Sequence, residues 1–102
     1  MSKKVYTIDE LKKKIGAVLS SFPVEKAILF GSYAKGEADG KSDVDLVIDS
    51  NDKIRGLKFF GVRAELEEML KKNVDLIEQK DIIKGGKAEV EIRKTGVIVY
   101  EA

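Results

Sequence analysis

The chain has 102 residues, of which 43% are apolar and 36% are charged, and this composition predicts one globular domain spanning residues 1–102. Its formal net charge is +1, so no overall positive field attracts nucleic acid, and we expect no direct nucleic-acid ligand. Cysteine and histidine are absent, which excludes disulfides, thiolate or imidazole zinc sites, and histidine as a general base. No segment resembles a signal peptide or a membrane span, so we expect a cytoplasmic protein without membrane contact.

The first part of the chain predicts one helix followed by two buried strands. Thr7 and Glu10 have the spacing of a capping box, and apolar residues then recur at helical intervals until Pro23 ends the helix. Short apolar runs at residues 26–30 and 44–48 have the length and composition of buried strands. We expect the apolar side of these strands to pack against helices.

The second part of the chain predicts a loop, two more helices and two more strands. In chain order we expect a polar loop at about residues 50–56, a helix at 57–72, a strand at 74–78, a short helix at 88–95 and a final strand at 97–100. Gly85-Gly86 favours a turn before the short helix, and we expect Gly96 to end that helix in the left-handed conformation. Because helices alternate with strands, the fold class is α/β (α+β), with a single mixed sheet backed by helices.

Two carboxylates stand one residue apart at the start of the second strand. Side chains alternate between the two faces of a strand, so Asp43 and Asp45 lie together on the face opposite the apolar residues. Neighbouring carboxylates repel each other unless a cation lies between them, and Mg²⁺ prefers carboxylate oxygens as ligands. The alternative is a solvated strand face at the edge of the sheet, because exposed carboxylates are common.

A third carboxylate, Asp75, stands at the start of the strand at residues 74–78. If this strand pairs beside the second, Asp75 can face the same cleft, and three carboxylates on neighbouring strands can bind two Mg²⁺ ions. Taken alone, Asp75 would be an ordinary exposed strand residue. Asp49 is on the same face as Asp43 and Asp45 but at the far end of the strand, so we rank it lower.

The turn after the first strand supplies a second feature of the candidate site. Gly31 allows the backbone to approach a phosphate closely, and Ser32 is placed to cap a short helix at about residues 33–37. The free N–H groups at the start of a helix favour anions. Lys35 can add a positive charge near the phosphates, although a solvated lysine is the simpler interpretation. By itself, a Gly-Ser pair indicates only a tight turn with a helix cap.

Two better-known motifs do not fit this region. The glycine spacing from Gly31 to Gly36 is that of a P-loop, but Glu37 and Ala38 stand where Lys and Ser or Thr are required. The acidic segment that follows has the wrong residues for a calcium-binding EF-hand loop, since Ser50 falls where a bidentate Glu belongs.

Taken together, Gly31-Ser32-x-Ala34-x-Gly36 and Ser42-Asp43-x-Asp45-Leu46 resemble the signature of the DNA polymerase β-like nucleotidyltransferase superfamily. More closely, the chain resembles the minimal nucleotidyltransferases (MNT) that occur as antitoxins beside HEPN-type toxins. The resemblance covers nearly the whole chain, from the leading helix to the closing strand. It implies the polymerase β-like nucleotidyltransferase core as the fold.

The resemblance also implies a role for each matching residue. Asp43 and Asp45 match the ligands of both Mg²⁺ ions, and Asp75 matches the third carboxylate, which binds the catalytic metal and helps to deprotonate the attacking hydroxyl. Gly31 and Ser32 match the pair that holds the β- and γ-phosphates of the nucleotide.

The chain departs from the family at two positions next to this pair. Family members often carry arginine where this chain has Tyr33 or Lys35, so the resemblance implies the metal ligands and not phosphate contacts at these two positions. We retain Lys35 as a candidate nucleotide-binding residue.

The reaction that the resemblance implies is attack of an acceptor hydroxyl on the α-phosphorus of ATP, with pyrophosphate leaving. Because the sequence ends just after the catalytic core, we expect a second protein to present the hydroxyl, and the resemblance suggests a tyrosine of a HEPN ribonuclease toxin. Two alternatives stay open: a non-catalytic antitoxin that neutralises its partner by contact, and a nucleotidyltransferase that acts on RNA or a small molecule.

Overall fold

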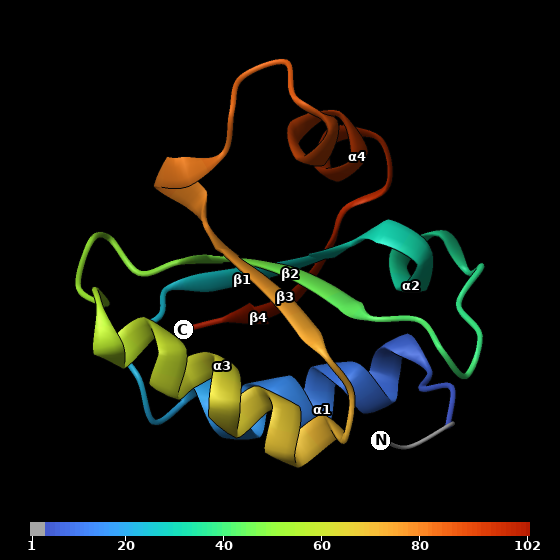
Figure 1. The fold of residues 1–102 in the computed structure, drawn as a ribbon, viewed down its shortest axis with the longest axis horizontal. Coiled ribbons are helices and arrows are strands. Elements are labelled where there is room, and N and C mark those ends of the chain that lie inside the picture. The colour runs from blue at the N-terminus through green and yellow to red at the C-terminus, as the bar shows by residue number, and fades with distance from the viewer. Residues whose placement is uncertain (1–3) are drawn as a thin grey trace.

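A four-stranded mixed sheet forms the middle of the molecule (Figure 1). The computed structural model describes residues 4–102. In chain order the strands are β1 (Lys26–Phe30), β2 (Val44–Asp49), β3 (Val74–Glu78) and β4 (Val97–Glu101). Their spatial order is β3-β2-β1-β4; β1 pairs antiparallel with β2 and β4, and β3 runs parallel to β2. The single mixed sheet confirms the expected fold class.

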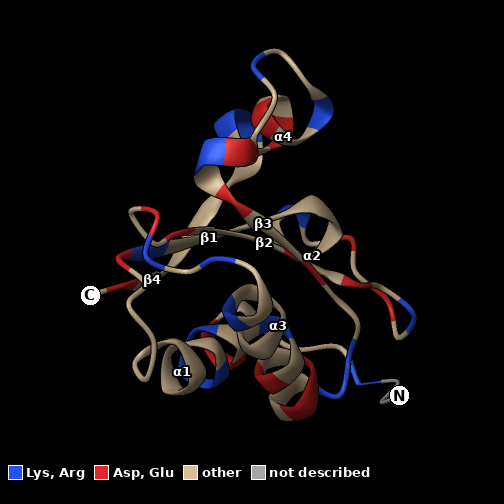
Figure 2. Ribbon diagram, turned by 60° about the vertical axis from the view of Figure 1, so that its left-hand side comes forward, with Lys and Arg blue, Asp and Glu red and all other residues tan. Residues whose placement is uncertain are grey.

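The helices divide between the two faces of the sheet. The longer helices α1 (Ile8–Leu19) and α3 (Leu57–Leu70) lie together on one face, and α4 (Lys87–Thr95) lies on the opposite face (Figures 1 and 2). The short helix α2 (Gly31–Lys35) follows β1 directly, and a 3₁₀ turn, η1 (Gln79–Asp81), follows β3. No helix within residues 4–102 is long and apolar enough to cross a membrane.

The main core lies between the sheet and the α1–α3 layer. The apolar residues of β2 that alternate with its carboxylates, Val44, Leu46 and Ile48, are all completely buried there. The capping box predicted at the start of α1 is present: the Glu10 amide donates to Thr7 Oγ1 at 3.1 Å, and the Thr7 amide donates to Glu10 Oε1 at 2.9 Å. The carboxylates of β2 are therefore turned away from the core and toward the side on which α4 lies.

The start of α2 differs from the expectation that Ser32 caps a helix beginning at residue 33. The helix begins at Gly31, its N-cap position is occupied by Phe30 without a side-chain hydrogen bond, and Ser32 lies inside the first turn. The reason is that Gly31 has φ +74°, which lets the chain turn immediately after β1. The Ser32 hydroxyl is consequently not used to cap α2.

The end of α4 also differs from the expectation. Gly96 has φ −61° and ψ 141°, which is extended and not left-handed. A Cβ atom at this position would overlap the carbonyl oxygen of Ile92 and come within 3.0 Å of Ile28 Cγ2. Glycine is required here because the chain passes close to α4 and β1, a constraint that depends on tertiary packing.

Candidate functional site

A cleft of about 410 Å³ opens on the face of the sheet that α4 overhangs. Its lining combines the turn after β1, one carboxylate each from β2 and β3, and one side of α4; it includes Gly31, Ser32, Asp45, Asp75, Lys87 and Glu91. Residues from four separate segments of the chain therefore meet in one cavity. Four of these six, Gly31, Ser32, Asp45 and Asp75, are also the residues that the sequence indicates.

Asp45 and Asp75 are brought together by the parallel pairing of β2 and β3. The two residues are direct partners in the register of these strands, so their side chains lie on the same face of the sheet. Both line the cleft. The predicted adjacency of these two carboxylates is therefore present in the structure, and it depends on β3 lying beside β2.

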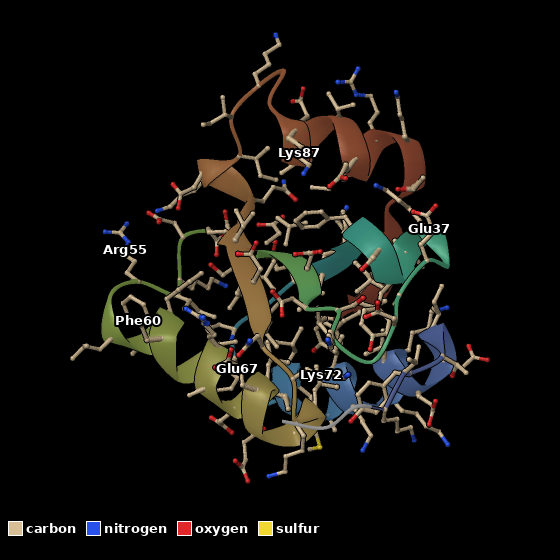
Figure 3. The ribbon with its side chains drawn as sticks, turned by 45° about the vertical axis from the view of Figure 1, so that its right-hand side comes forward. Glu37, Arg55, Phe60, Glu67, Lys72 and Lys87 are labelled. Carbon is tan, nitrogen blue, oxygen red and sulfur yellow. The ribbon has the colours of Figure 1, made fainter. Side chains whose placement is uncertain are left out.

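Asp43 lies at the rim of this site. It precedes β2, is exposed, and does not line the cleft. Two hydrogen bonds fix the backbone on either side of Asp43. The Val44 amide donates to the Asn73 carbonyl at 3.0 Å, and Lys72 Nζ donates to the Gly40 carbonyl at 2.9 Å. Lys72 itself is only 3% exposed, and Figure 3 labels it near the start of β3. The loop that carries Asp43 is thus anchored to the chain just before Asp75.

Asp49, the fourth carboxylate considered, lies elsewhere. It occupies the other end of β2, where it pairs in register with Lys26 and where its Oδ1 accepts a hydrogen bond from the Asn51 amide at 3.0 Å. It does not line the cleft. This position agrees with its lower ranking from the sequence.

Gly31 packs directly against the Asp45 carboxylate. A Cβ atom at Gly31 would overlap Asp45 Oδ2 and lie 2.9 Å from Asp45 Cγ. Glycine is therefore required here for two reasons: the positive φ angle, and the contact with the carboxylate. The turn and the carboxylate form a single unit, although they are separated by 14 positions in the sequence.

Negative charge accumulates around Asp45. Burial raises the pKa of its carboxyl from the ordinary value of 3.8 to about 6. The charges of Asp75 and Asp43 add to this increase, and that of Glu91 adds further, whereas the Lys87 ammonium lowers the pKa. An ionised Asp45 is therefore unfavourable unless positive charge is brought into the cleft.

The donor set fits a hard divalent cation. Asp45 and Asp75 offer neighbouring carboxylate oxygens, and Asp43 is near enough to affect the ionisation of Asp45. Within residues 4–102, however, no three acidic, histidine or cysteine side chains are already gathered closely enough to enclose a metal ion. The residues that would hold Mg²⁺ are thus Asp45 and Asp75 from the floor of the cleft and Asp43 from its rim.

Tyr33 and Lys35, which follow the Gly31-Ser32 turn, are placed differently from each other. Tyr33 is only 4% exposed and packs into the core, and burial raises the pKa of its phenol, so this side chain is not available to a phosphate. Lys35 Nζ forms an ion pair with Glu91 Oε1 at 2.8 Å and does not line the cleft. The predicted phosphate contact of Lys35 therefore remains a prediction.

The sequence did not identify Lys87 and Glu91, which form the wall contributed by α4. Figure 3 shows Lys87 at the beginning of α4, on the side of the sheet that carries the cleft. The two residues are four positions apart and so share one face of the helix. That spacing was visible in the sequence, but only the tertiary fold places this face over the two aspartates.

Known proteins resemble this chain in sequence and in fold. A family model described as polymerase beta, nucleotidyltransferase, matches residues 13–102. The protein adenylyltransferase MntA of Thermococcus cleftensis is 34% identical over 98 residues, which cover 92% of this chain and 95% of that protein.

Two solved structures share the fold. One is a toxin–antitoxin with AMP-PNP, with a TM-score of 0.76 at 20% identity over 89% of this chain and 73% of that one. The other is a complex of a tri-AMPylated Shewanella oneidensis HEPN toxin with its MNT antitoxin, with a TM-score of 0.70 at 18% identity over 92% and 73% of the two chains.

Proposed function

Because this chain belongs to the polymerase beta nucleotidyltransferase family, we propose that it transfers AMP from ATP, in the presence of Mg²⁺, to a hydroxyl group of a partner protein. The observation that carries the proposal is the cleft in which the Gly31-Ser32 turn packs against Asp45, with Asp75 beside it. This arrangement offers phosphate-binding groups and carboxylates to the same ligand.

The turn between β1 and α2 is the proposed site for the β- and γ-phosphates. Ser32 lines the cleft, and its hydroxyl makes no capping hydrogen bond to α2, so it can donate to a phosphate oxygen. Gly31 has no side chain to keep a phosphate away from the backbone N–H groups of the turn. The nucleotide would therefore extend from this turn toward the two aspartates.

Asp43, Asp45 and Asp75 are the proposed ligands of two Mg²⁺ ions. When bound, these ions supply positive charge that neutralises the triphosphate and the charge that develops during transfer. This role suits a cleft in which the pKa of Asp45 is raised by burial and by like charges. The protein's own contribution is to hold the three carboxylates around the reacting phosphate.

In the proposed reaction, the acceptor oxygen forms a bond to the α-phosphorus, and the bond from that phosphorus to the oxygen bridging the α- and β-phosphates breaks. Pyrophosphate leaves with the bonding electrons. Asp75, which lines the cleft as an exposed carboxylate, accepts the proton of the attacking hydroxyl. Most of the rate enhancement would come from positioning and from charge neutralisation.

We further propose that the acceptor is a tyrosine of a HEPN-type ribonuclease toxin, so that the chain acts as an antitoxin. Support comes from a relative named as a protein adenylyltransferase and from structural neighbours that are complexes of MNT antitoxins with HEPN toxins, one of them AMPylated. Attached AMP would add a bulky anion near the ribonuclease site and so exclude RNA.

The proposal is tested with the double variant Asp43→Asn with Asp45→Asn. We expect AMP transfer to the HEPN-type partner, measured as a mass increase of the partner by intact-protein mass spectrometry, to fall by about a thousandfold or more, because charge stabilisation of the transition state is lost. Protection of cells against the partner should be lost with it.

Asp49→Asn is the matched control, since it removes a carboxylate on the same strand and face but outside the cleft. It should retain both transfer and protection. If the double variant still protects cells while transferring no AMP, the chain neutralises its partner by contact, and the enzymatic proposal is wrong.

A further inference from the structure

We infer that Lys87, the first residue of α4, binds a phosphate group of the nucleotide, so that α4 forms a second phosphate-binding wall facing the Gly31-Ser32 turn. The inference rests on the proposed function, because it takes a nucleoside triphosphate as the ligand of the cleft. It adds a basic residue that lies 51 positions beyond the end of the Gly31–Gly36 signature.

The position of Lys87 is the first argument. Of the residues within 4–102 that line the cleft, Lys87 is the only cation, and it shares the lining with Ala88 and Glu91 from the same face of α4. Gly31 and Ser32 line the same cavity from another segment, and Asp45 and Asp75 line it from the sheet. A triphosphate held at the turn and extending toward the aspartates therefore occupies the cavity that Lys87 faces.

The charge balance of the cleft is the second argument. Three carboxylates, Asp45, Asp75 and Glu91, line it, and the triphosphate brings further negative charge. The Lys87 ammonium is near enough to this site to lower the pKa of Asp45, although burial and the neighbouring carboxylates raise that pKa more strongly. A lysine ammonium is a compact charge that binds phosphate oxygens well.

Glu91 reduces the positive charge that an incoming phosphate meets at α4. Its carboxylate accepts a hydrogen bond from Lys35 at 2.8 Å, which lowers its pKa, and the charge of Lys87, one helical turn away, lowers the pKa further. Glu91 thus pairs with Lys35, and its negative charge also offsets that of Lys87, so it reduces the attraction of this side of the cleft for an incoming phosphate. Removing its carboxylate should make nucleotide binding tighter.

The test is isothermal titration of the purified full chain with Mg²⁺ and an ATP analogue whose α–β bridging oxygen is replaced by a methylene group. We expect Lys87→Met to weaken binding about 10-fold or more, because a hydrogen bond to a charged group is lost, and Lys87→Arg to retain most of the affinity. Glu91→Gln should bind about 3- to 10-fold more tightly, because a like charge is removed.

Lys84→Met is the matched control, since Lys84 is an exposed lysine of the preceding loop that does not line the cleft. It should bind like the wild type. Adenosine should bind equally to the wild type and to Lys87→Met, because it has no phosphate.

Two results would overturn the inference alone: wild-type affinity for the analogue in Lys87→Met, or an equal loss of affinity for adenosine. A wild-type chain that binds no Mg-nucleotide would overturn the proposed function as well.

Discussion

Replacing Gly31 by alanine is expected to abolish AMP transfer and to lower the free energy of unfolding by about 2–4 kcal/mol. Two effects add. The backbone at Gly31 has φ +74°, which is strained for alanine, and the new Cβ would overlap the Asp45 carboxylate. To relieve the overlap Asp45 must move, and the proposed metal ligand is then lost together with stability. Urea denaturation and transfer assays measure the two effects separately.

Gly36→Ala is the matched control for this prediction. Gly36 also has φ +74°, but nothing lies within 4 Å of the place where its Cβ would be. Alanine there should cost only the backbone strain, about 1–2 kcal/mol, and should leave transfer intact. If the two variants lose stability equally and both keep their activity, the contact between Gly31 and Asp45 has no functional importance.

Replacing Asp45 by asparagine is expected to make the protein more stable at neutral pH while it abolishes transfer. Burial, with the neighbouring charges of Asp75 and Asp43, raises the pKa of Asp45 to about 6 in the folded protein, above its ordinary value of 3.8. The folded state therefore favours the protonated carboxyl. The contribution of this protonated group to the free energy of unfolding is complete below about pH 4 and is lost as the pH rises through about 6. Asparagine remains uncharged throughout.

The size of this effect follows from the pKa shift. A shift of about two units corresponds to about 3 kcal/mol, and solvent screening of a half-buried side chain reduces this to about 1–2 kcal/mol. Urea denaturation of the wild type and of Asp45→Asn from pH 4 to pH 8 should show equal stabilities at the acid end, an advantage for the variant that grows between about pH 4 and about pH 6, and a constant advantage at higher pH. A constant difference across that range would contradict the electrostatic account of the cleft.

Mg²⁺ provides a second readout of the same prediction. Because an ion bound to the folded state stabilises it, adding MgCl₂ at pH 7.5 should raise the stability of the wild type and have a smaller effect on Asp45→Asn. That result would mean that repulsion among the Asp43, Asp45 and Asp75 carboxylates destabilises the metal-free protein and that bound Mg²⁺ reduces this repulsion.

The part of the site that could be predicted from the sequence is the part set by strand geometry. Alternation along a strand is enough to place Asp45 opposite the buried residues Val44 and Leu46. Asp75 is likewise recognisable as a candidate site carboxylate because it stands at the start of a strand. The parallel pairing of β2 and β3 then brings it beside Asp45. Local chemistry also predicted the capping box of α1.

The remaining features depend on contacts between distant segments. Gly31 and Gly96 each lie against another part of the chain, and neither contact can be recognised from neighbouring residues. Lys35 forms its ion pair with Glu91 of α4, which lies 56 positions further along the chain. The wall formed by Lys87 and Glu91 exists because the chain after η1 returns over the sheet, which no local pattern encodes.

The most direct test of the account is to incubate the chain and its HEPN-type partner with Mg²⁺ and ATP labelled at either the α- or the γ-phosphate. We predict that the partner acquires label from the α-phosphate only and that pyrophosphate is released in equal amount. Transfer of the γ-label would identify a kinase, and no transfer of either label would contradict the nucleotidyltransferase mechanism.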